Sequence, residues 1–188
     1  MRDGTETKER IERAAIRMFV KHGVNGASIR EIAREAGVSQ GAMYNHYTSK
    51  EDLAWALFSR SWSDIAVEMR QRMHGEPTLL AKLRALTNCV FRRFEEDWEL
   101  VTYVYFSRHE NIRRVTASLP NPHLVVRLAI VDGMARGEIP RQNAEVATAM
   151  VMGILIQIID TKALGRIKPD LTKLADSVAE ACFRALMG

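Results

Sequence analysis

The 188-residue sequence predicts an all-α fold, with a short unit of three helices at the N-terminus followed by a longer helical unit. Apolar residues recur at spacings of three and four along most of the chain, which is the period of a helix buried on one face. Serine, threonine, asparagine and aspartate stand where these segments begin, as helix N-caps do, and Gly137, Gly165 and Pro169 stand where they end. No segment has the alternating pattern of a strand.

The first helix is expected to run from a cap on Thr5 or Thr7 to about Lys21, and His22 and Gly23 are expected to end it. Its apolar residues fall on one stripe, which would pack over the helices that follow. The stripe consists of Ile11, Ala14, Ala15, Met18 and Phe19.

A second helix is expected to begin at Ser28, because Ser28 and Glu31 have the S-x-x-E spacing of a capping box. Gly37 is expected to end it, since glycine adopts the left-handed conformation of a helix C-terminus without a Cβ clash. Val38 would fill the angle that follows, and Ser39 would cap the next helix. The buried stripe of the second helix consists of Ile29, Ile32, Ala33 and Ala36.

The third helix is expected from Gln40 to Tyr47, with Met43 and Tyr47 facing the core. Its outward side chains are small at the N-terminal end and hydrogen-bonding around it: Gln40, Gly41, Ala42, Tyr44, Asn45 and His46. A helix end of this kind fits the major groove of DNA. The layout is that of a DNA-reading helix-turn-helix, although the same geometry also occurs as plain packing in all-α proteins.

The outward residues suggest specific contacts with DNA. Gln40 and Arg30 have the length and the donor groups to read base edges, and the small residues after Gln40 allow close approach. Lys50 and Tyr44 would contact phosphates. The first 50 residues carry nine lysines and arginines against six acidic residues, which supports phosphate contact only weakly. The expected DNA-binding residues are Ser28, Arg30, Ser39, Gln40, Gly41, Ala42, Tyr44, His46 and Lys50.

Ser49, with Asp52 three residues later, predicts the start of a long helix that reaches about Met73 and breaks at residues 74–77. The domain boundary is placed at this helix, between residues 1–50 and residues 51–188. Five further helices are expected, from Pro77 to about Glu96, from Asp97 to about Asn111, from Pro122 to about Arg136, from Asn143 to about Leu164 and from Asp170 to Leu186.

The sequence contains no motif of an enzyme or of a metal site. It has no G-x-S-x-G, no P-loop and no G-x-G-x-x-G. Cys89 and Cys182 lie outside any C-x-x-C spacing, and none of the five histidines lies in an H-E-x-x-H. We expect a protein that is not an enzyme and that needs neither a cofactor nor a metal.

The composition, 47% hydrophobic and 27% charged, is that of a soluble globular protein. The most apolar run, Ala147 to Ile159, is expected to be too short to span a membrane and is interrupted by Thr148 and Gln157. The N-terminus lacks the apolar stretch of a signal peptide. We therefore expect a cytoplasmic protein that does not contact a membrane.

Residues 32–53 resemble the N-terminal pattern of the TetR family of bacterial transcriptional regulators, which runs close to I-A-x-x-A-G-V-S-x-G-x-x-Y-x-H-F-x-S-K-E-x-L. Tyr47 stands where phenylalanine is usual, and Ser28 stands where threonine is common. The resemblance is specific over this stretch and covers the rest of the chain only by helix order and length. The matching residues are Ile32, Ala33, Ala36, Gly37, Val38, Ser39, Gly41, Tyr44, His46, Ser49, Lys50, Glu51 and Leu53.

The resemblance implies a repressor that binds a palindromic operator in double-stranded DNA as a homodimer and is released by a small hydrophobic effector. An N-terminal three-helix helix-turn-helix DNA-binding domain would precede a C-terminal helical domain for ligand binding and dimerisation. The alternative is an architectural DNA-binding protein without an effector. Loss of DNA binding on addition of a small molecule would separate the two.

In the family, a small molecule lies between helices of the C-terminal domain, and the resemblance extends this site to the middle of the chain. Aromatic and methionine stripes at helical spacing are, residue by residue, more often core than ligand site. The candidate effector-pocket residues are Trp62, Met69, Trp98, Tyr105 and His109.

The segment from Ala147 to Ile159 is apolar on nearly every face, which indicates burial on two sides. In the family, the last two helices of each subunit form a four-helix dimer interface. A monomeric core built around this helix is the alternative. The candidate interface residues are Met150, Ile154, Ile158, Leu174, Val178 and Cys182.

Overall fold

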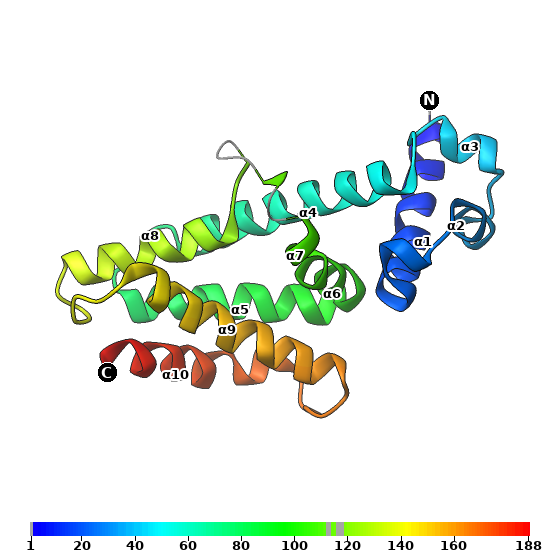
Figure 1. The fold of residues 1–188 in the computed structure, drawn as a ribbon. Coiled ribbons are helices and arrows are strands. Elements are labelled where there is room, and N and C mark those ends of the chain that lie inside the picture. Colours follow the sequence, from blue (N-terminus) through cyan, green and yellow to red (C-terminus); the bar gives the residue numbers. More distant parts are fainter. Residues whose placement is uncertain (1, 112–113, 116–118) are drawn as a thin grey trace. The chain divides into compact units, whose positions relative to one another are not determined.

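The computed structural model describes the backbone of residues 2–111, 114–115 and 119–188, and helices are the regular elements in these ranges (Figure 1). The chain forms two compact units. The first contains residues 1–61 and 103–115, and the second contains residues 62–102 and 116–188. The division falls inside the long helix that begins after Ser49, eleven residues beyond the expected boundary at residue 50, because the first turns of that helix pack within the first unit.

The first unit is built on helices α1 (Arg2–Gly26), α2 (Ile29–Ala36) and α3 (Gln40–Tyr44). Residues 50–61 of α4 (Lys50–Met73) complete it, together with the end of α6 (Trp98–Phe106) and the short α7 (Arg108–Asn111). Most of the predicted apolar stripes of α1 and α2 lies in its core, whereas Met18 and Ile29 are only half-buried. The side chains that are at least 95% buried include Ile11, Ala14, Ala15, Phe19, Ile32, Ala33 and, from α3, Met43.

Three boundaries in this unit differ from those expected. Helix α1 begins before Thr5, at Arg2, although it breaks at Gly23 as predicted, where φ is 69°. Helix α3 ends at Tyr44 rather than Tyr47, but the Tyr47 amide still donates to the Met43 carbonyl at 2.9 Å and the ring is buried. The expected helix from Asp97 to Asn111 is interrupted at Ser107 and forms α6 and α7.

The second unit contains α5 (Leu79–Glu96), α8 (Pro122–Ala135), α9 (Ala144–Ala163) and α10 (Ala175–Met187). Helix α10 packs along α5 and against α9, and α8 packs against α9 (Figure 1). A 3₁₀ turn, Leu171–Leu174, precedes α10, so the helix expected from Asp170 is regular only from Ala175.

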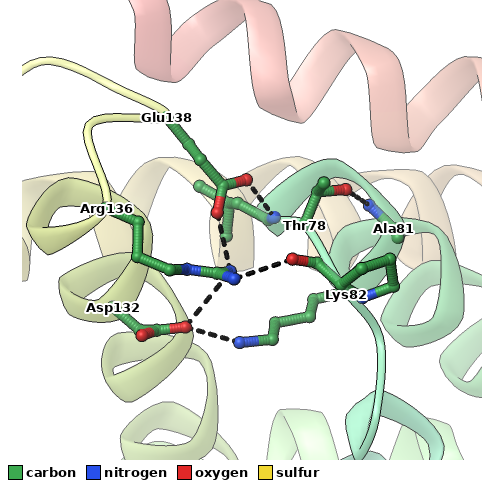
Figure 2. Close-up of polar contacts among 8 residues, drawn as sticks. Thr78, Ala81, Lys82, Asp132, Arg136 and Glu138 are labelled. Atoms are coloured by element: carbon green, nitrogen blue, oxygen red, sulfur yellow. Dashed lines mark hydrogen bonds and ion pairs between the residues drawn. The ribbon is translucent and has the colours of Figure 1, made fainter.

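A polar network joins the start of α5 to the end of α8 (Figure 2). Arg136 Nη1 donates to the Pro77 carbonyl at 2.7 Å, and Arg136 Nη2 lies 2.6 Å from Glu138 Oε1. Glu138 also accepts from the Leu79 amide, which is an otherwise unpaired donor at the helix start. Lys82 Nζ donates to Asp132 Oδ2 at 2.6 Å and holds the pKa of that carboxyl below its usual value.

Within the same junction, α8 approaches α5 at Gly133. A Cβ atom at this position would lie 2.7 Å from Leu79 Cδ2 and 3.2 Å from Leu79 Cβ. Leu79 is completely buried, so its side chain has little room to move away. The close contact between the two helices therefore requires glycine at position 133.

Helix α9 is long and apolar enough to cross a membrane by length and composition, so the expected exclusion by length does not hold for the full 20-residue helix. Such a helix also serves as the core of a soluble domain. One third of its most apolar window is buried inside the second unit. The residues that provide this burial are Ala147, Thr148, Val151, Met152, Leu155 and Ile159.

Candidate nucleic-acid interface

The second helix begins at the cap that the sequence predicts. Ser28 Oγ accepts from the Glu31 amide at 3.2 Å, and its hydroxyl donates to Glu31 Oε2 at 2.6 Å. The carboxylate bonds the Ser28 hydroxyl and also interacts with the Ser28 backbone, as a capping box requires. The hydrogen bond from Ser28 lowers the pKa of Glu31. Glu31 thus stays ionised near the positive end of the α2 dipole.

The turn between α2 and α3 depends on Gly37, which has φ 65° and ψ 38°. The Gly37 amide donates to the Arg34 carbonyl and the Val38 amide to the Ala33 carbonyl, which closes the helix end. Arg10 reaches from α1 and bonds the carbonyls of Ala36 and Gly37 at 2.6 and 2.9 Å. A Cβ at residue 37 would lie 2.7 Å from Arg10 Nη2, so this glycine is required by its φ and by its neighbour.

Helix α3 presents the surface that the sequence assigns to DNA. Ser39 Oγ caps it by accepting from the Ala42 amide at 3.1 Å. Gln40 and Gly41 are exposed, and Tyr44 is 56% exposed. A Cβ at Gly41 would meet only Ser39 Oγ at 3.8 Å, which is ordinary contact. Nothing within the subunit requires a glycine there.

A partly buried carboxylate holds the segment that follows α3 against the rest of the unit. Glu12 Oε1 on α1 accepts from the Tyr47 hydroxyl at 2.6 Å, and Arg60 on α4 grips both Glu12 oxygens at 2.9 and 2.6 Å. Burial raises the pKa of Glu12, but the hydrogen bonds from Arg60 and Tyr47 outweigh it and hold the pKa below its usual value. Burial raises the pKa of Tyr47, so its hydroxyl remains a donor at neutral pH.

Lys50 has partners that the sequence did not predict. Its Nζ donates to the carbonyls of Asn25 and Ala27, both at 3.1 Å, where α1 ends and the chain turns into α2. The ammonium group thus satisfies orphan carbonyls at a helix C-terminus. Its contact with phosphate remains a prediction. The base contact expected of the exposed Arg30 and the DNA contact expected of the half-buried His46 also remain predictions.

The expected effector-pocket residues do not gather in one unit. Trp62 and Met69 belong to the second unit and are at least 99% buried there. Tyr105 is buried in the first unit, and the His109 side chain lies outside the described residues. Trp98 is 49% exposed, and its place in an effector pocket remains a prediction.

The expected interface residues lie mostly at the surface. Five of the six are partly exposed: Met150, Ile154 and Ile158 on α9, Leu174 at the end of the 3₁₀ turn, and Val178 on α10. Cys182 is completely buried, so its place in the interface is wrong. It shares a face of α10 with the buried residues Ala175, Ala179 and Leu186.

The described residues contain no group of three or more His, Cys, Asp or Glu side chains placed to hold a metal ion. Both cysteines are buried free thiols. Burial, together with the neighbouring Glu68, raises the pKa of Cys89 to about 12, and burial raises that of Cys182 to about 11. Neither thiol has the lowered pKa of a reactive cysteine.

Two family models together match most of the chain. The model described as "Bacterial regulatory proteins, tetR family" matches residues 11–57. The model described as "YsiA-like protein, C-terminal region" matches residues 58–185.

Curated relatives include the fatty acid metabolism regulator protein of Bacillus subtilis (strain 168), which is 23% identical over 172 residues and covers 89% of both chains. The HTH-type transcriptional regulator AcrR of Shigella flexneri is 35% identical over 78 residues, which is 40% of this chain and 36% of AcrR. The second match therefore covers only part of each protein.

Solved structures share the fold. The fatty acid degradation regulator FadR from Bacillus halodurans aligns with a TM-score of 0.80 at 23% identity over 93% of both chains. FadR from Bacillus subtilis, in complex with stearoyl-CoA, aligns with a TM-score of 0.74 at 22% identity over 94% of this chain and 97% of that one.

Proposed function

Because the chain belongs to the TetR family of bacterial regulatory proteins and is a DNA-binding transcriptional regulator, we propose that it is a homodimeric repressor. We further propose that a long-chain acyl thioester releases it from its operator. It acts as a regulator and not as an enzyme. In this proposal residues 1–50 contact DNA and residues 51–188 bind the effector and the second subunit.

The exposed N-terminal end of α3 is the observation that carries the DNA-binding role. Gln40, Gly41 and Tyr44 project from a helix that is capped by Ser39 and anchored through Tyr47. The turn before it is fixed by Gly37 and Arg10. A rigid, exposed helix end of small and hydrogen-bonding residues suits the major groove, in which Gln40 pairs with adenine and Tyr44 holds the backbone.

The open face of α9 supports the homodimer. Val146 is 56% exposed, Met150 and Ile154 are half-buried, and a Cβ at Gly153 would have no atom within 4 Å. An apolar helix face with room at its centre suits a second helix. A two-fold dimer also matches a palindromic operator, whose half-sites lie about 34–36 Å apart or a multiple of that distance.

The effector class rests on the relatives that match the whole length of the chain. The Bacillus subtilis regulator acts in fatty acid metabolism by its name, and the FadR structure from the same organism holds stearoyl-CoA. A long acyl chain agrees with the apolar effector that the sequence suggests. Because α4 belongs to both units, an effector bound in the second unit can bias the DNA-binding unit through a continuous helix.

The test begins with selection of genomic fragments by the purified protein, which yields the operator. Stearoyl-CoA, stearate and coenzyme A are then compared for release of the selected fragment. We expect release by micromolar stearoyl-CoA and none by coenzyme A alone. Failure to enrich any fragment would contradict the DNA-binding role, and failure of stearoyl-CoA to release an enriched fragment would contradict the effector class.

A further inference from the structure

A cluster of three arginines surrounds one carboxylate between α4 and α5 in the second unit. Arg93 Nη1 lies 2.9 Å from Glu68 Oε2, whereas Arg92 Nη2 and Arg72 Nη2 lie 3.5 and 3.8 Å from Glu68 Oε1. Only the first of these distances is that of a good hydrogen bond. Arg72, Arg92 and Arg93, here called the arginine cluster, therefore share Glu68 as their common counter-charge.

The arginine cluster is not neutralised by its surroundings. Glu96 lies 3.9 Å from Arg92 Nε, but its side chain is 68% exposed, and such a pair contributes little. The side chains of Arg93 and Glu68 are only 25% exposed, so repulsion among the three guanidinium groups is less screened than at an open surface. The position favours an anion with more than one negative charge.

One donor of the cluster is also without a partner. The Nε atom of Arg93 is buried and makes no hydrogen bond within the described part of the chain. A buried donor that is left unpaired costs free energy, so the single carboxylate of Glu68 does not satisfy the cluster completely. Arg72 and Arg92 are 51% and 37% exposed, so a ligand can reach the cluster from solvent.

We propose that the arginine cluster binds the phosphate groups of a ligand and, resting on the proposed function, that these are the phosphates of the coenzyme A part of the effector. Planar guanidinium groups bind phosphate through paired N–H donors. The phosphate groups also supply more than one negative charge, which would balance the excess positive charge of the cluster. A free fatty acid offers one carboxylate and no such group. The cluster thus selects the thioester over the free acid.

The direct test removes the two exposed arginines. We expect the Arg72→Ala/Arg92→Ala protein to bind stearoyl-CoA and coenzyme A at least tenfold more weakly in calorimetry, because charge-assisted hydrogen bonds to phosphate are lost. Binding of stearate is expected to be unchanged. The matched control is Arg84→Ala, which removes a 46%-exposed arginine of α5 that pairs with Glu180 at 3.0 Å. Equal coenzyme A affinities of the double variant and the control would overturn the proposal.

A second variant separates a phosphate site from a purely structural ion-pair network. Glu68→Gln keeps the shape of the side chain but removes the charge that competes with phosphate. A phosphate site predicts several-fold tighter binding of coenzyme A by the folded variant. A structural network predicts lower thermal stability without that gain, and unchanged or weaker binding would contradict our proposal.

The same experiments show separately whether the proposed role of the arginine cluster and the proposed effector class are correct. If coenzyme A binding depends on the arginine cluster but stearoyl-CoA does not release the operator, the cluster is a phosphate site and the effector class is wrong. If stearoyl-CoA releases the operator equally from the wild-type protein and the double variant, the effector class holds and the role of the cluster is wrong.

Discussion

Gly41 is exposed at the start of α3, and the subunit itself has no need of a glycine there. We expect Gly41→Ala to leave the free energy of unfolding unchanged or to raise it by up to about 1 kcal/mol, since alanine favours the helix. Operator affinity should fall about tenfold or more, because the added methyl group prevents close approach to the groove. Chemical denaturation and a DNA-binding titration measure the two effects.

Gly37→Ala is the matched control for that substitution. Its left-handed backbone costs a non-glycine residue about 1–2 kcal/mol, and the Cβ would also displace Arg10. Stability and DNA binding should therefore both fall in Gly37→Ala. In Gly41→Ala only DNA binding should fall. Undiminished operator binding by Gly41→Ala would show that this helix end does not enter the groove.

Tyr47 differs from Phe by the hydroxyl that bonds Glu12. Tyr47→Phe should lower the free energy of unfolding by about 1.5–3 kcal/mol, the range for hydrogen bonds to charged groups. The folded-state pKa of Glu12 is lowered, so its contribution is complete above the unfolded pKa and is lost as the pH falls through the folded pKa. The variant should therefore show a weaker loss of stability in acid, measured by denaturation from pH 7 to pH 3. Identical acid profiles would show that Glu12 is not the group that titrates.

Lys50 serves the fold through the carbonyls of Asn25 and Ala27, and we also expect it to contact phosphate. Lys50→Ala should reduce the slope of log affinity against log salt by about one charge, equally for all DNA sequences. Unfolding measured in parallel separates this from the loss of the two hydrogen bonds. An unchanged salt slope in a folded variant would restrict Lys50 to its structural role.

At the scale of whole helices, the N-cap residues allowed the starts of helices to be predicted from the sequence. Ser28, Ser39 and Asn143 cap helices as expected, because each bonds an amide within three residues of itself in the chain. The bond from Tyr47 to Glu12 spans 35 residues, and no local pattern predicts it. The break at Ser107 has no glycine or proline to mark it.

The candidate sites were predictable to a different degree. The α3 surface follows from one short stretch, so residues such as Gln40 and Tyr44 were found exposed as expected. Helix α10 instead has apolar or small residues on two faces, and periodicity alone does not say which face meets α5. Cys182 was therefore assigned to the wrong face, and the arginine cluster, which joins two helices, was not found at all.

The close contact between α5 and α8 depends on Gly133, which has no side chain. Gly133→Ala should lower the free energy of unfolding by about 1–3 kcal/mol, because the new methyl group meets the buried Leu79. Gly153→Ala, on the open face of α9, is the control and should not destabilise the subunit. Thermal unfolding of the two variants should differ by several degrees. Equal melting temperatures would mean that α8 can shift without cost.

For the whole molecule, DNA reading requires two subunits, and α9 offers the surface that joins them. Ile154 is only half-buried within its own subunit, so a polar replacement there leaves the fold intact. We expect Ile154→Asp to give folded monomers in light scattering, because a dimer joined through this face would bury an unpaired carboxylate from each subunit. Operator affinity should then fall steeply, since a single recognition helix occupies only one half-site.

Leu128→Asp is the control for this last substitution, because it places the same charge on a 56%-exposed residue of α8, outside the expected interface. It should remain dimeric and bind the operator normally. If Ile154→Asp is also dimeric, the subunits join through another face, and loss of dimers in Leu128→Asp alone would identify that face as α8. A wild-type protein that is monomeric at micromolar concentration would remove the dimer from the mechanism, and with it the need for a palindromic operator.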